Sequence, residues 1–352
     1  MKTWDNMHYN SRKIDGHNKP FNFIMSPREP GKTTFFWVKK IYKQWKKTGR
    51  PWYYMLRNIT EISEALIESI QGTLNEFTDD GVQLKYKAGK LDSGIVDIFI
   101  NDKIIFRIVA LSCKLRKIKL AILPNAEGAL MDEYIIDPQT GEKYLEGEAF
   151  KIKEAYTTWR RGYGGNNIFK MYFLANPYSL YNPLFVDWHV NTNQLKRGEI
   201  LTGDIFAIEW AQLSPELRAH LLKVNPLFKF DEDYSKYALE GQAVQDANIK
   251  ISPFPNGYKL QFVFKYDNIF IGIYRNMNYN ENDKFYAKEV SQNLINRDIY
   301  CFDFADMIKG SVLIGLDERL RLRIFKDAVR TMSISFENVN LYYIIKEVYS
   351  QI

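Results

Sequence analysis

The stretch that decides the fold reads Ser26-Pro27-Arg28-Glu29-Pro30-Gly31-Lys32-Thr33-Thr34. It follows the apolar run Phe21–Met25 and precedes a second apolar run, so a buried strand, a turn and a helix are expected in succession. This is the spacing of a phosphate-binding loop, in which backbone N–H groups and the helix N-terminus surround the phosphates. In such a loop Lys32 would contact the β- and γ-phosphates, and the Thr33 hydroxyl would bind magnesium. We therefore predict that these residues bind ATP with Mg²⁺, although Ser26 stands where the first glycine is expected.

A second motif, Gly128-Ala129-Leu130-Met131-Asp132-Glu133, ends an apolar stretch with two acids. Nucleotide-binding sheets present a magnesium-organising aspartate and a water-activating glutamate in this way. We expect Asp132 to hold Mg²⁺ together with Thr33, and Glu133 to polarise the attacking water. Taken alone, the two acids would equally fit a solvated strand end, and Gly128 and Ala129 replace the bulky residues usual in a buried parallel strand. Together with the loop, they favour a nucleotide hydrolase.

Length and composition narrow the class of protein. The chain has 352 residues, which suggests about two domains, and its 46% hydrophobic and 15% aromatic content predicts a folded protein. No apolar run is long enough to span a membrane, and the N-terminus lacks the apolar segment of a signal peptide. Cys113 and Cys301 lie far apart, and the four histidines show no zinc pattern. These features are typical of a protein from a reducing cytoplasm.

The net charge of +6 is unevenly distributed. One basic cluster follows the phosphate-binding loop and a second lies in mid-chain; they consist of Lys39, Lys40, Lys43, Lys46, Lys47 and Arg50, and of Lys114, Arg116, Lys117 and Lys119. Basic clusters bind polyanions by neutralising phosphates. Each cluster taken alone is more typical of a solvated helix face.

Residues 1–20 read as an irregular lead-in. From Phe21 to about Val190, strand-like and helical segments alternate, which predicts an α/β ATPase domain over residues 1–195. The expected strands are Phe21–Met25, Trp52–Leu56, Ile104–Leu111, Ala129–Asp132 and Ile168–Ala175. The expected helices are Thr33–Lys47, Ile59–Ile70 and Glu148–Thr158, with a β-hairpin over Val82–Phe106 near the nucleotide. Residues 196–245, which contain short helical segments, are expected to form a linker or bridging subdomain.

Residues 246–352 show a different pattern, which predicts a small α+β domain. Tyr258–Phe264 and Ile269–Tyr274 flank a turn and read as a hairpin, and Asp283–Val290 reads as a third strand. Two amphipathic helices are expected at Leu316–Thr331 and Val339–Tyr349.

The motif order resembles a known family once two further stretches are included, Trp159-Arg160-Arg161 and Phe173-Leu174-Ala175-Asn176-Pro177-Tyr178. It resembles the DNA-packaging ATPases of small podoviruses of the phi29 group, which are ring motors of the ASCE class related to large terminase subunits. The resemblance covers nearly the whole chain. Its most specific features are Arg28 inside the loop, the triplet Asp132-Glu133-Tyr134, and Asn176 followed by Asn182-Pro183. It implies an ASCE-type P-loop ATPase domain followed by an RNase H-like, vestigial nuclease domain.

The resemblance also implies roles for individual residues. Arg160, with Arg161 as the alternative, falls where such motors place the arginine that reaches a neighbour's γ-phosphate; a plain surface ion pair is the competing interpretation. Asn176 would sense the γ-phosphate or orient the water. Arg57, at the end of the second strand, would pair with Glu133 and hold it inactive until DNA binds.

Nuclease activity is not expected from the second domain. Two-metal cleavage needs several carboxylates that converge on the ions, yet the first strand, Tyr258–Phe264, contains none. Asp267 falls in a turn, and Asp303 and Asp306 have no evident partner. We therefore interpret this domain as a vestigial nuclease that binds nucleic acid.

The favoured function is ATP-driven translocation of viral double-stranded DNA into a preformed procapsid. The resemblance implies a homo-oligomeric ring, with five as the expected subunit number, docked on the procapsid portal in the host cytoplasm. It leaves open whether a structural RNA takes part, and no membrane is involved. The alternatives are an ATPase or helicase with other DNA work, and a nucleotide-regulated nucleic-acid-binding protein without turnover.

Overall fold

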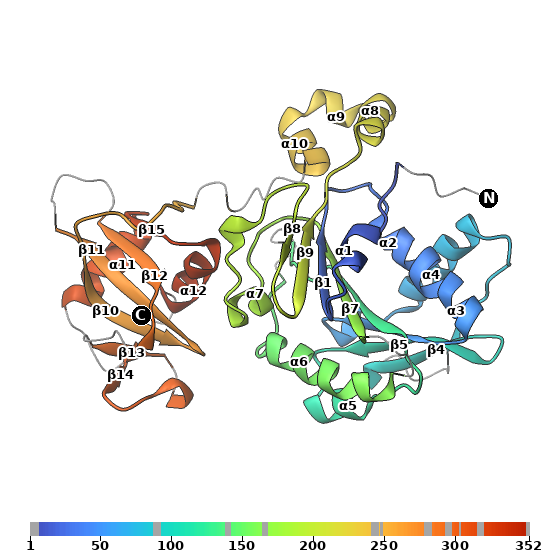
Figure 1. Cartoon of the computed structure of the whole chain (residues 1–352), viewed down its shortest axis with the longest axis horizontal. Helices are drawn as coiled ribbons and strands as arrows, with labels where there is room; N and C mark the ends of the chain where they lie inside the picture. The colour runs from blue at the N-terminus through green and yellow to red at the C-terminus, as the bar shows by residue number, and fades with distance from the viewer. Residues whose placement is uncertain are drawn as a thin grey trace. The chain divides into compact units, whose positions relative to one another are not determined.

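A computed structural model describes residues 7–86, 93–137, 142–163, 168–240, 246, 249–277, 284–292, 298–302, 304–314 and 320–349. The chain divides into two compact units (Figure 1). Unit 1 comprises residues 1–179 and 194–244, and unit 2 comprises residues 180–193 and 245–352. Each unit has its own sheet.

Unit 1 is built on a nine-stranded sheet with the order β3-β4-β5-β2-β6-β7-β1-β9-β8. Its six central strands run parallel to their neighbours; they are β5 (Lys103–Ala110), β2 (Trp52–Leu56), β6 (Gly128–Asp132), β7 (Lys170–Ala175), β1 (Phe21–Met25) and β9 (Phe206–Trp210). Antiparallel strands close both edges; they are β4 (Ile95–Ile100), β3 (Lys85–Tyr86) and β8 (Ile200–Thr202). This confirms the predicted α/β domain.

Helices cover both faces of this sheet (Figure 1). The helix predicted after the loop forms as α2 (Lys32–Phe35), a π-helical segment (Phe36–Tyr42) and α3 (Lys43–Thr48). Trp37 of this helix packs on Tyr54 of β2 with ring centroids 4.9 Å apart, whereas Trp159 of α6 (Glu148–Trp159) stacks on Tyr53 at 4.0 Å. Because neighbouring residues of a strand point to opposite faces, the two helices lie on opposite sides of the sheet.

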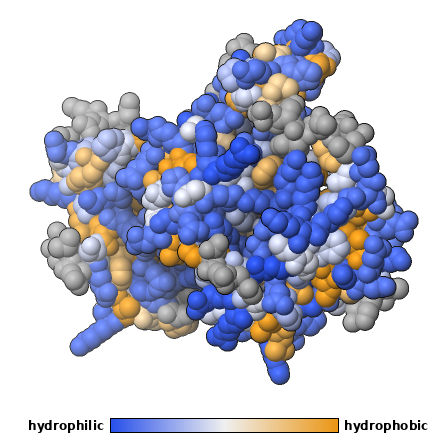
Figure 2. Space-filling view, turned by 45° about the vertical axis from the view of Figure 1, so that its right-hand side comes forward, coloured by the Kyte–Doolittle hydropathy of each residue, from blue (hydrophilic) through white to orange (hydrophobic). Residues whose placement is uncertain are grey.

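The remaining helices of unit 1 lie around this framework. They are α1 (Arg12–Gly16), α4 (Glu64–Phe77), α5 (Leu115–Leu120), α8 (Pro215–Val224), α9 (Leu227–Phe230) and α10 (Glu232–Glu240). The last three gather into a small group at one end of the unit, at the top of Figure 1. Among the described residues, no helix is long and apolar enough to cross a membrane. On the face shown in Figure 2, hydrophilic residues predominate and hydrophobic residues form small separate patches.

The division into units differs from the expected boundaries at 195 and 245. Residues 200–210 are not a linker, because β8 and β9 extend the large sheet beside β1. Residues 180–193, with α7 (Pro183–Asp187), belong instead to unit 2, where the Leu180 N–H donates to Asp246 and Tyr181 stacks on Tyr343. The predicted hairpin forms as β4 and β5, which lie beside β2 and are separated from β1 by β2, β6 and β7.

Unit 2 contains a six-stranded sheet with the order β14-β13-β10-β11-β12-β15. The predicted meander is confirmed as β10 (Tyr258–Tyr266), β11 (Ile269–Asn276) and β12 (Phe285–Glu289), which pair antiparallel. Parallel strands extend it on both sides; they are β13 (Ile299–Cys301), β14 (Ser311–Leu313) and β15 (Ile334–Phe336). The predicted helices form as α11 (Leu320–Arg330) and α12 (Val339–Tyr349).

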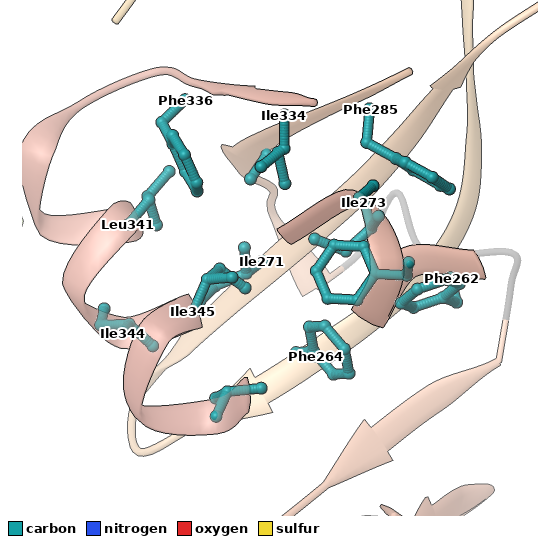
Figure 3. Packing of buried hydrophobic residues seen from close by; sticks show 14 of the residues in the cluster. Phe262, Phe264, Ile271, Ile273, Phe285, Ile334, Phe336, Leu341, Ile344 and Ile345 are labelled. Carbon is teal, nitrogen blue, oxygen red and sulfur yellow. The ribbon is translucent and has the colours of Figure 1, made fainter. Parts of the chain in front are cut away.

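One hydrophobic core holds unit 2 together. Figure 3 shows Phe264 and Ile271 of the sheet facing Leu341 and Ile345 of α12. All four side chains are at most 2% exposed. Alternate residues of the strands supply this face, as the period of two in a strand requires.

The glycine that weakened the second motif in the sequence is required by packing. A Cβ atom on Gly128 would lie 2.9 Å from the Lys170 carbonyl oxygen and 3.0 Å from the Trp52 ring. A backbone carbonyl in the centre of a sheet cannot move aside easily. The first residue of β6 must therefore be small, and this requirement outweighs the low strand propensity of glycine.

We expect Gly128→Ala to lower the free energy of unfolding by about 1–3 kcal/mol, the usual cost of overpacking. Gly72→Ala is the matched control, because nothing lies within 4 Å of a Cβ there and the residue is in α4. It should raise stability by about 0.5–1 kcal/mol. Urea unfolding of both variants beside the parent protein measures the difference, and equal stability of the two would contradict the packing interpretation.

Candidate active site

Except for Arg160 and Arg161, the predicted site residues converge at one edge of the large sheet. The strands β2, β6, β7 and β1 are consecutive and parallel in the sheet, so their carboxyl ends lie side by side at this edge. The phosphate-binding loop follows β1, Asn176 follows β7, Asp132 ends β6 and Arg57 follows β2. Ligands of open α/β sheets bind at this edge.

The predicted phosphate-binding loop contains two residues in the left-handed conformation. Gly31 is the N-cap of α2 and adopts a left-handed conformation with φ 75°, and Glu29 also has φ 75°. Ser26 has an ordinary negative φ, so a side chain is tolerated where glycine was expected. Its N–H donates to the Ala175 carbonyl at 3.2 Å, which ties the start of the loop to β7.

Distant segments hold the loop in place. The Tyr9 N–H donates to the Pro30 carbonyl at 2.9 Å, and the Arg28 N–H donates to the Ala238 carbonyl at 3.0 Å. The Tyr9 hydroxyl donates to Glu209 at 2.8 Å. The N-terminal segment, expected from sequence to be only an irregular lead-in, therefore braces the loop from one side while α10 does so from the other.

Two hydrogen bonds join the predicted catalytic groups. The Lys32 ammonium donates to Asn176 Oδ1 at 2.7 Å, and the Thr33 hydroxyl donates to Asp132 Oδ2 at 2.8 Å. The Glu133 N–H donates to Asp132 Oδ1 at 3.0 Å, while the Glu133 side chain reaches solvent. Loop, acidic pair and asparagine thus form one polar cluster.

Burial shifts the pKa values of the charged members of this cluster. Loss of hydration lowers the pKa of Lys32 to about 8, although Asp132 and Glu133 oppose this shift. Desolvation raises the pKa of Asp132 against the effect of Lys32. Desolvation and then the Asp132 carboxylate raise the pKa of Glu133. A raised pKa suits a carboxylate that must accept a proton from water.

The donor atoms fit a magnesium ion. Mg²⁺ prefers hard oxygen ligands and usually takes one or two carboxylates together with substrate phosphates and water. The Thr33 hydroxyl and the Asp132 carboxylate lie side by side at the loop and supply such oxygens. Within the described ranges, no group of three or more His, Cys, Asp or Glu side chains could hold a metal without a substrate.

Arg57 does not form the predicted ion pair with the Glu133 carboxylate. Its Nε and Nη2 donate to Glu148 at 2.9 and 3.1 Å, and its Nη1 donates to the backbone carbonyl of Glu133 at 3.2 Å. Glu148 was not predicted to be part of the site. No local pattern could have identified it, because the pair joins residues 91 positions apart.

Arg28 and Tyr178 form a second pair at the rim. The Arg28 guanidinium donates to the Tyr178 hydroxyl at 2.8 Å and lies 3.9 Å from the Asp137 carboxylate. The Arg28 side chain is 43% exposed. Tyr178 lies in the motif that contains Asn176, but the sequence predicts no role for it.

Arg160 and Arg161 lie far from the loop of their own subunit. They follow α6 and precede β7, and the neighbouring Gly162 carbonyl accepts from Asn125, just before β6. This is the amino-terminal edge of the sheet, opposite Lys32. The 12 residues of α6 separate the two edges by about 18 Å. Both arginine side chains are exposed.

A cavity of about 350 Å³ adjoins the loop at Pro30. The N-terminal segment and the chain after β9 form its walls, which include Tyr9, Asn10, Glu209 and Gln212.

Several cations of the basic clusters are already paired within unit 1. Lys40 lies 2.5 Å from Asp15, Lys46 2.8 Å from Asp80, and Arg50 2.9 Å from Glu127. Lys119 pairs with Glu154. These ion pairs reduce the charge that the clusters offer to a polyanion.

In unit 2, the Asp306 carboxylate forms an ion pair with the Lys265 side chain. Lys265 donates to its Oδ1 at 3.0 Å, and the Asp267 N–H donates to its Oδ2 at 3.1 Å. Asp303 lies outside the described residues. The β10 strand contributes no acid, as the sequence indicated.

Comparison with known proteins identifies the family to which this chain belongs. The sequence matches the podovirus DNA encapsidation protein (Gp16) family over residues 4–352. The chain belongs to this family. No curated protein matches its sequence. The match confirms the resemblance to phi29-group packaging proteins that the motifs indicated.

Two solved structures share the Gp16-family fold along nearly the full chain. A chain of the bacteriophage Phi-29 viral genome packaging motor assembly is 18% identical with a TM-score of 0.70, and the match covers 98% of this chain and 99% of that one. The Phi-28 gp11 DNA packaging motor is 15% identical with a TM-score of 0.60, over 99% and 98%. Identities this low establish the fold alone.

The pKa of Lys32 leads to a prediction for this Gp16-family protein. Nucleotide phosphates should bind the protonated ammonium and raise its pKa, so above pH 8 binding must first take up a proton. We expect ATP affinity to fall about tenfold between pH 7 and pH 9. Lys32→Arg should lack this decline, because a guanidinium stays charged. Calorimetric titration at several pH values tests this, and parallel declines for both proteins would exclude Lys32 as the titrating group.

Proposed function

We propose that the chain is a ring-forming, ATP-driven translocase that moves double-stranded DNA into a procapsid. Membership of the Gp16 family makes it a DNA-encapsidation ATPase. The observation that supports turnover is the single cluster in which Lys32 meets Asn176 and Thr33 meets Asp132. A protein that only bound nucleotide would not need Glu133 at the open side of this cluster.

The geometry suggests how hydrolysis proceeds. The backbone N–H groups of the loop and Lys32 would bind the β- and γ-phosphates. Mg²⁺, held by Thr33 and Asp132, would supply positive charge to those phosphates. Glu133 would accept a proton from a water whose oxygen bonds to the γ-phosphorus while the bond to the bridging oxygen breaks, which releases ADP and phosphate. Asn176, already hydrogen-bonded to Lys32, would orient the γ-phosphate or the water.

We place the base of ATP toward the cavity beside Pro30. The cavity adjoins the loop that would hold the phosphates, and Asn10 and Gln212 provide polar groups in its wall. Binding there would connect the nucleotide to the N-terminal segment that braces the loop.

The position of the arginines supports a site that is completed by a neighbour. Arg160 and Arg161 cannot reach the loop of their own subunit, since they lie at the opposite edge of the sheet. An exposed arginine at a subunit boundary can neutralise the charge that develops on a neighbour's γ-phosphate. Hydrolysis would then depend on ring assembly, for which five subunits is the expected number.

Unit 2 would bind nucleic acid without cutting it. The ion pair of Asp306 with Lys265 removes a carboxylate that a two-metal site would need. The partners we propose are double-stranded DNA, the procapsid portal and other copies of the chain, in the cytoplasm of the host cell.

Substitutions in the cluster should separate binding from chemistry. We expect Lys32→Ala and Asp132→Ala to abolish ATP hydrolysis through loss of phosphate and metal binding. Glu133→Gln should bind ATP normally but slow turnover by about 100-fold or more, because the amide cannot accept the proton. ATP binding and steady-state hydrolysis, with and without duplex DNA, measure both effects. Near-normal turnover by Glu133→Gln would remove this residue from the mechanism.

Mixed rings test whether the arginine acts on a neighbour. Arg160→Ala subunits keep an intact ATP site, and Lys32→Ala subunits keep an intact arginine. If Arg160 acts between subunits, mixing the two inactive proteins should restore part of the ATP turnover. The same mixture with Arg161→Ala decides between the two arginines.

Arg116→Ala is the matched control for these mixtures, because Arg116 is an exposed arginine of α5 in the same unit. It should retain turnover by itself. Parent turnover per subunit should also rise with protein concentration as rings assemble. No restoration by either arginine variant, with concentration-independent turnover, would contradict the ring mechanism.

A further inference from the structure

A buried ion pair lies beside the nucleotide edge of unit 1. Arg57 is 4% exposed and Glu148, the first residue of α6, is 2% exposed. The guanidinium binds both carboxylate oxygens, with Nε donating to Oε2 at 2.9 Å and Nη2 to Oε1 at 3.1 Å. Replacing buried ion pairs with apolar residues often leaves stability unchanged or higher. Stability alone therefore does not explain this pair.

The same guanidinium holds the peptide that follows the catalytic glutamate. Nη1 donates to the Glu133 carbonyl at 3.2 Å, and Nη2 donates to the Tyr134 carbonyl at 3.1 Å. On the amino side of Glu133, its N–H donates to Asp132 Oδ1 at 3.0 Å. Glu133 has φ 56°, a left-handed conformation that a residue with a side chain adopts only when its surroundings enforce it. Arg57 and Asp132 provide that enforcement.

Glu148 in turn is fixed from several directions. Its Oε2 also accepts from the Leu145 N–H at 3.0 Å, and the ring of Tyr144 lies 5.2 Å from the Arg57 guanidinium. At the other end of α6, Trp159 stacks on Tyr53 and donates to the Ile118 carbonyl at 3.1 Å. Because both ends of the helix are anchored, Glu148 can hold Arg57 at a defined place.

We propose that Glu148 is a positioning residue that acts through Arg57 to keep Glu133 aligned for attack on ATP. The proposal rests on the ATPase function above. A general base must lie within hydrogen-bonding distance of the water it activates, and a displacement of 1 Å can cost about a hundredfold in rate. Without the two donors of Arg57, the left-handed peptide can relax, and the carboxylate moves with it.

Conservative variants of the full-length chain test this role. Arg57→Lys keeps the charge but loses the bidentate contact and one carbonyl contact, and Glu148→Gln loses the charge but keeps the shape. We expect both to lower the single-turnover rate of ATP hydrolysis by about 10- to 100-fold. The dissociation constant for ATP should change less than about threefold, because Lys32 and the loop are untouched. A structural defect alone would not lower the rate of hydrolysis while leaving the dissociation constant for ATP nearly unchanged.

The chain offers a matched control in the pair Arg107 and Asp97. Arg107 Nε and Nη2 donate to both Asp97 oxygens at 2.6 and 2.9 Å, and its Nη1 donates to the Ile122 carbonyl at 3.0 Å. This pair joins β4 and β5, away from the site. Arg107→Lys and Asp97→Asn should therefore leave ATP hydrolysis within about twofold of the parent, even where thermal unfolding shows a loss of stability.

A double variant covers the case in which the single variants do not fold. Arg57→Met with Glu148→Leu leaves no unpaired buried charge and should fold, as comparable replacements do. It should bind ATP and hydrolyse it slowly. Folded single or double variants that hydrolyse ATP at the parent rate would overturn the positioning role. So would a loss of ATP affinity equal to the loss in rate.

The outcome separates this inference from the proposed function. A parent protein without DNA-stimulated hydrolysis would refute both. A parent that hydrolyses ATP while the Arg57 and Glu148 variants match the Arg107 and Asp97 controls would refute only the positioning role. As a further check, Lys32→Ala subunits that also carry Arg57→Lys should still restore turnover to Arg160→Ala subunits, since the arginine they offer is intact.

Discussion

The parallel alignment of β1, β7 and β6 is the constraint on which the site depends. Parallel neighbours end at the same edge of a sheet, so the loop after β1, the asparagine after β7 and the acids at the end of β6 meet without long loops. The contact between Lys32 and Asn176 and the contact between Thr33 and Asp132 follow from this arrangement. Packing of β6 against its neighbours also requires Gly128.

Burial gives this cluster its chemical properties. Lys32 loses hydration and its pKa falls, whereas the pKa values of Asp132 and Glu133 rise. All three shifts disfavour the charged forms when no ligand is present. Nucleotide phosphates and a metal ion would supply the missing opposite charges, so the cluster is suited to bind both together. Asn176 meanwhile gives the Lys32 ammonium a hydrogen-bond acceptor.

α6 connects the two edges of the large sheet. Its first residue, Glu148, holds Arg57 beside Glu133, and Arg160 and Arg161 follow its last turn. The stack of Trp159 on Tyr53 and the ion pair of Glu148 anchor the helix at both ends. A rigid helix of this kind would keep the glutamate of one site and the arginine offered to a neighbour in a constant relation.

Local sequence determined the phosphate-binding loop, the Asp132-Glu133 pair, the central strands and the meander of unit 2, because strand periodicity and motif spacing are properties of neighbouring residues. Only the tertiary structure decided that Arg57 pairs with Glu148, that β8 and β9 join the large sheet, and that residues 180–193 belong to unit 2. These features depend on contacts between segments far apart in the chain. Periodicity within one segment carries no information about which distant segment it will meet.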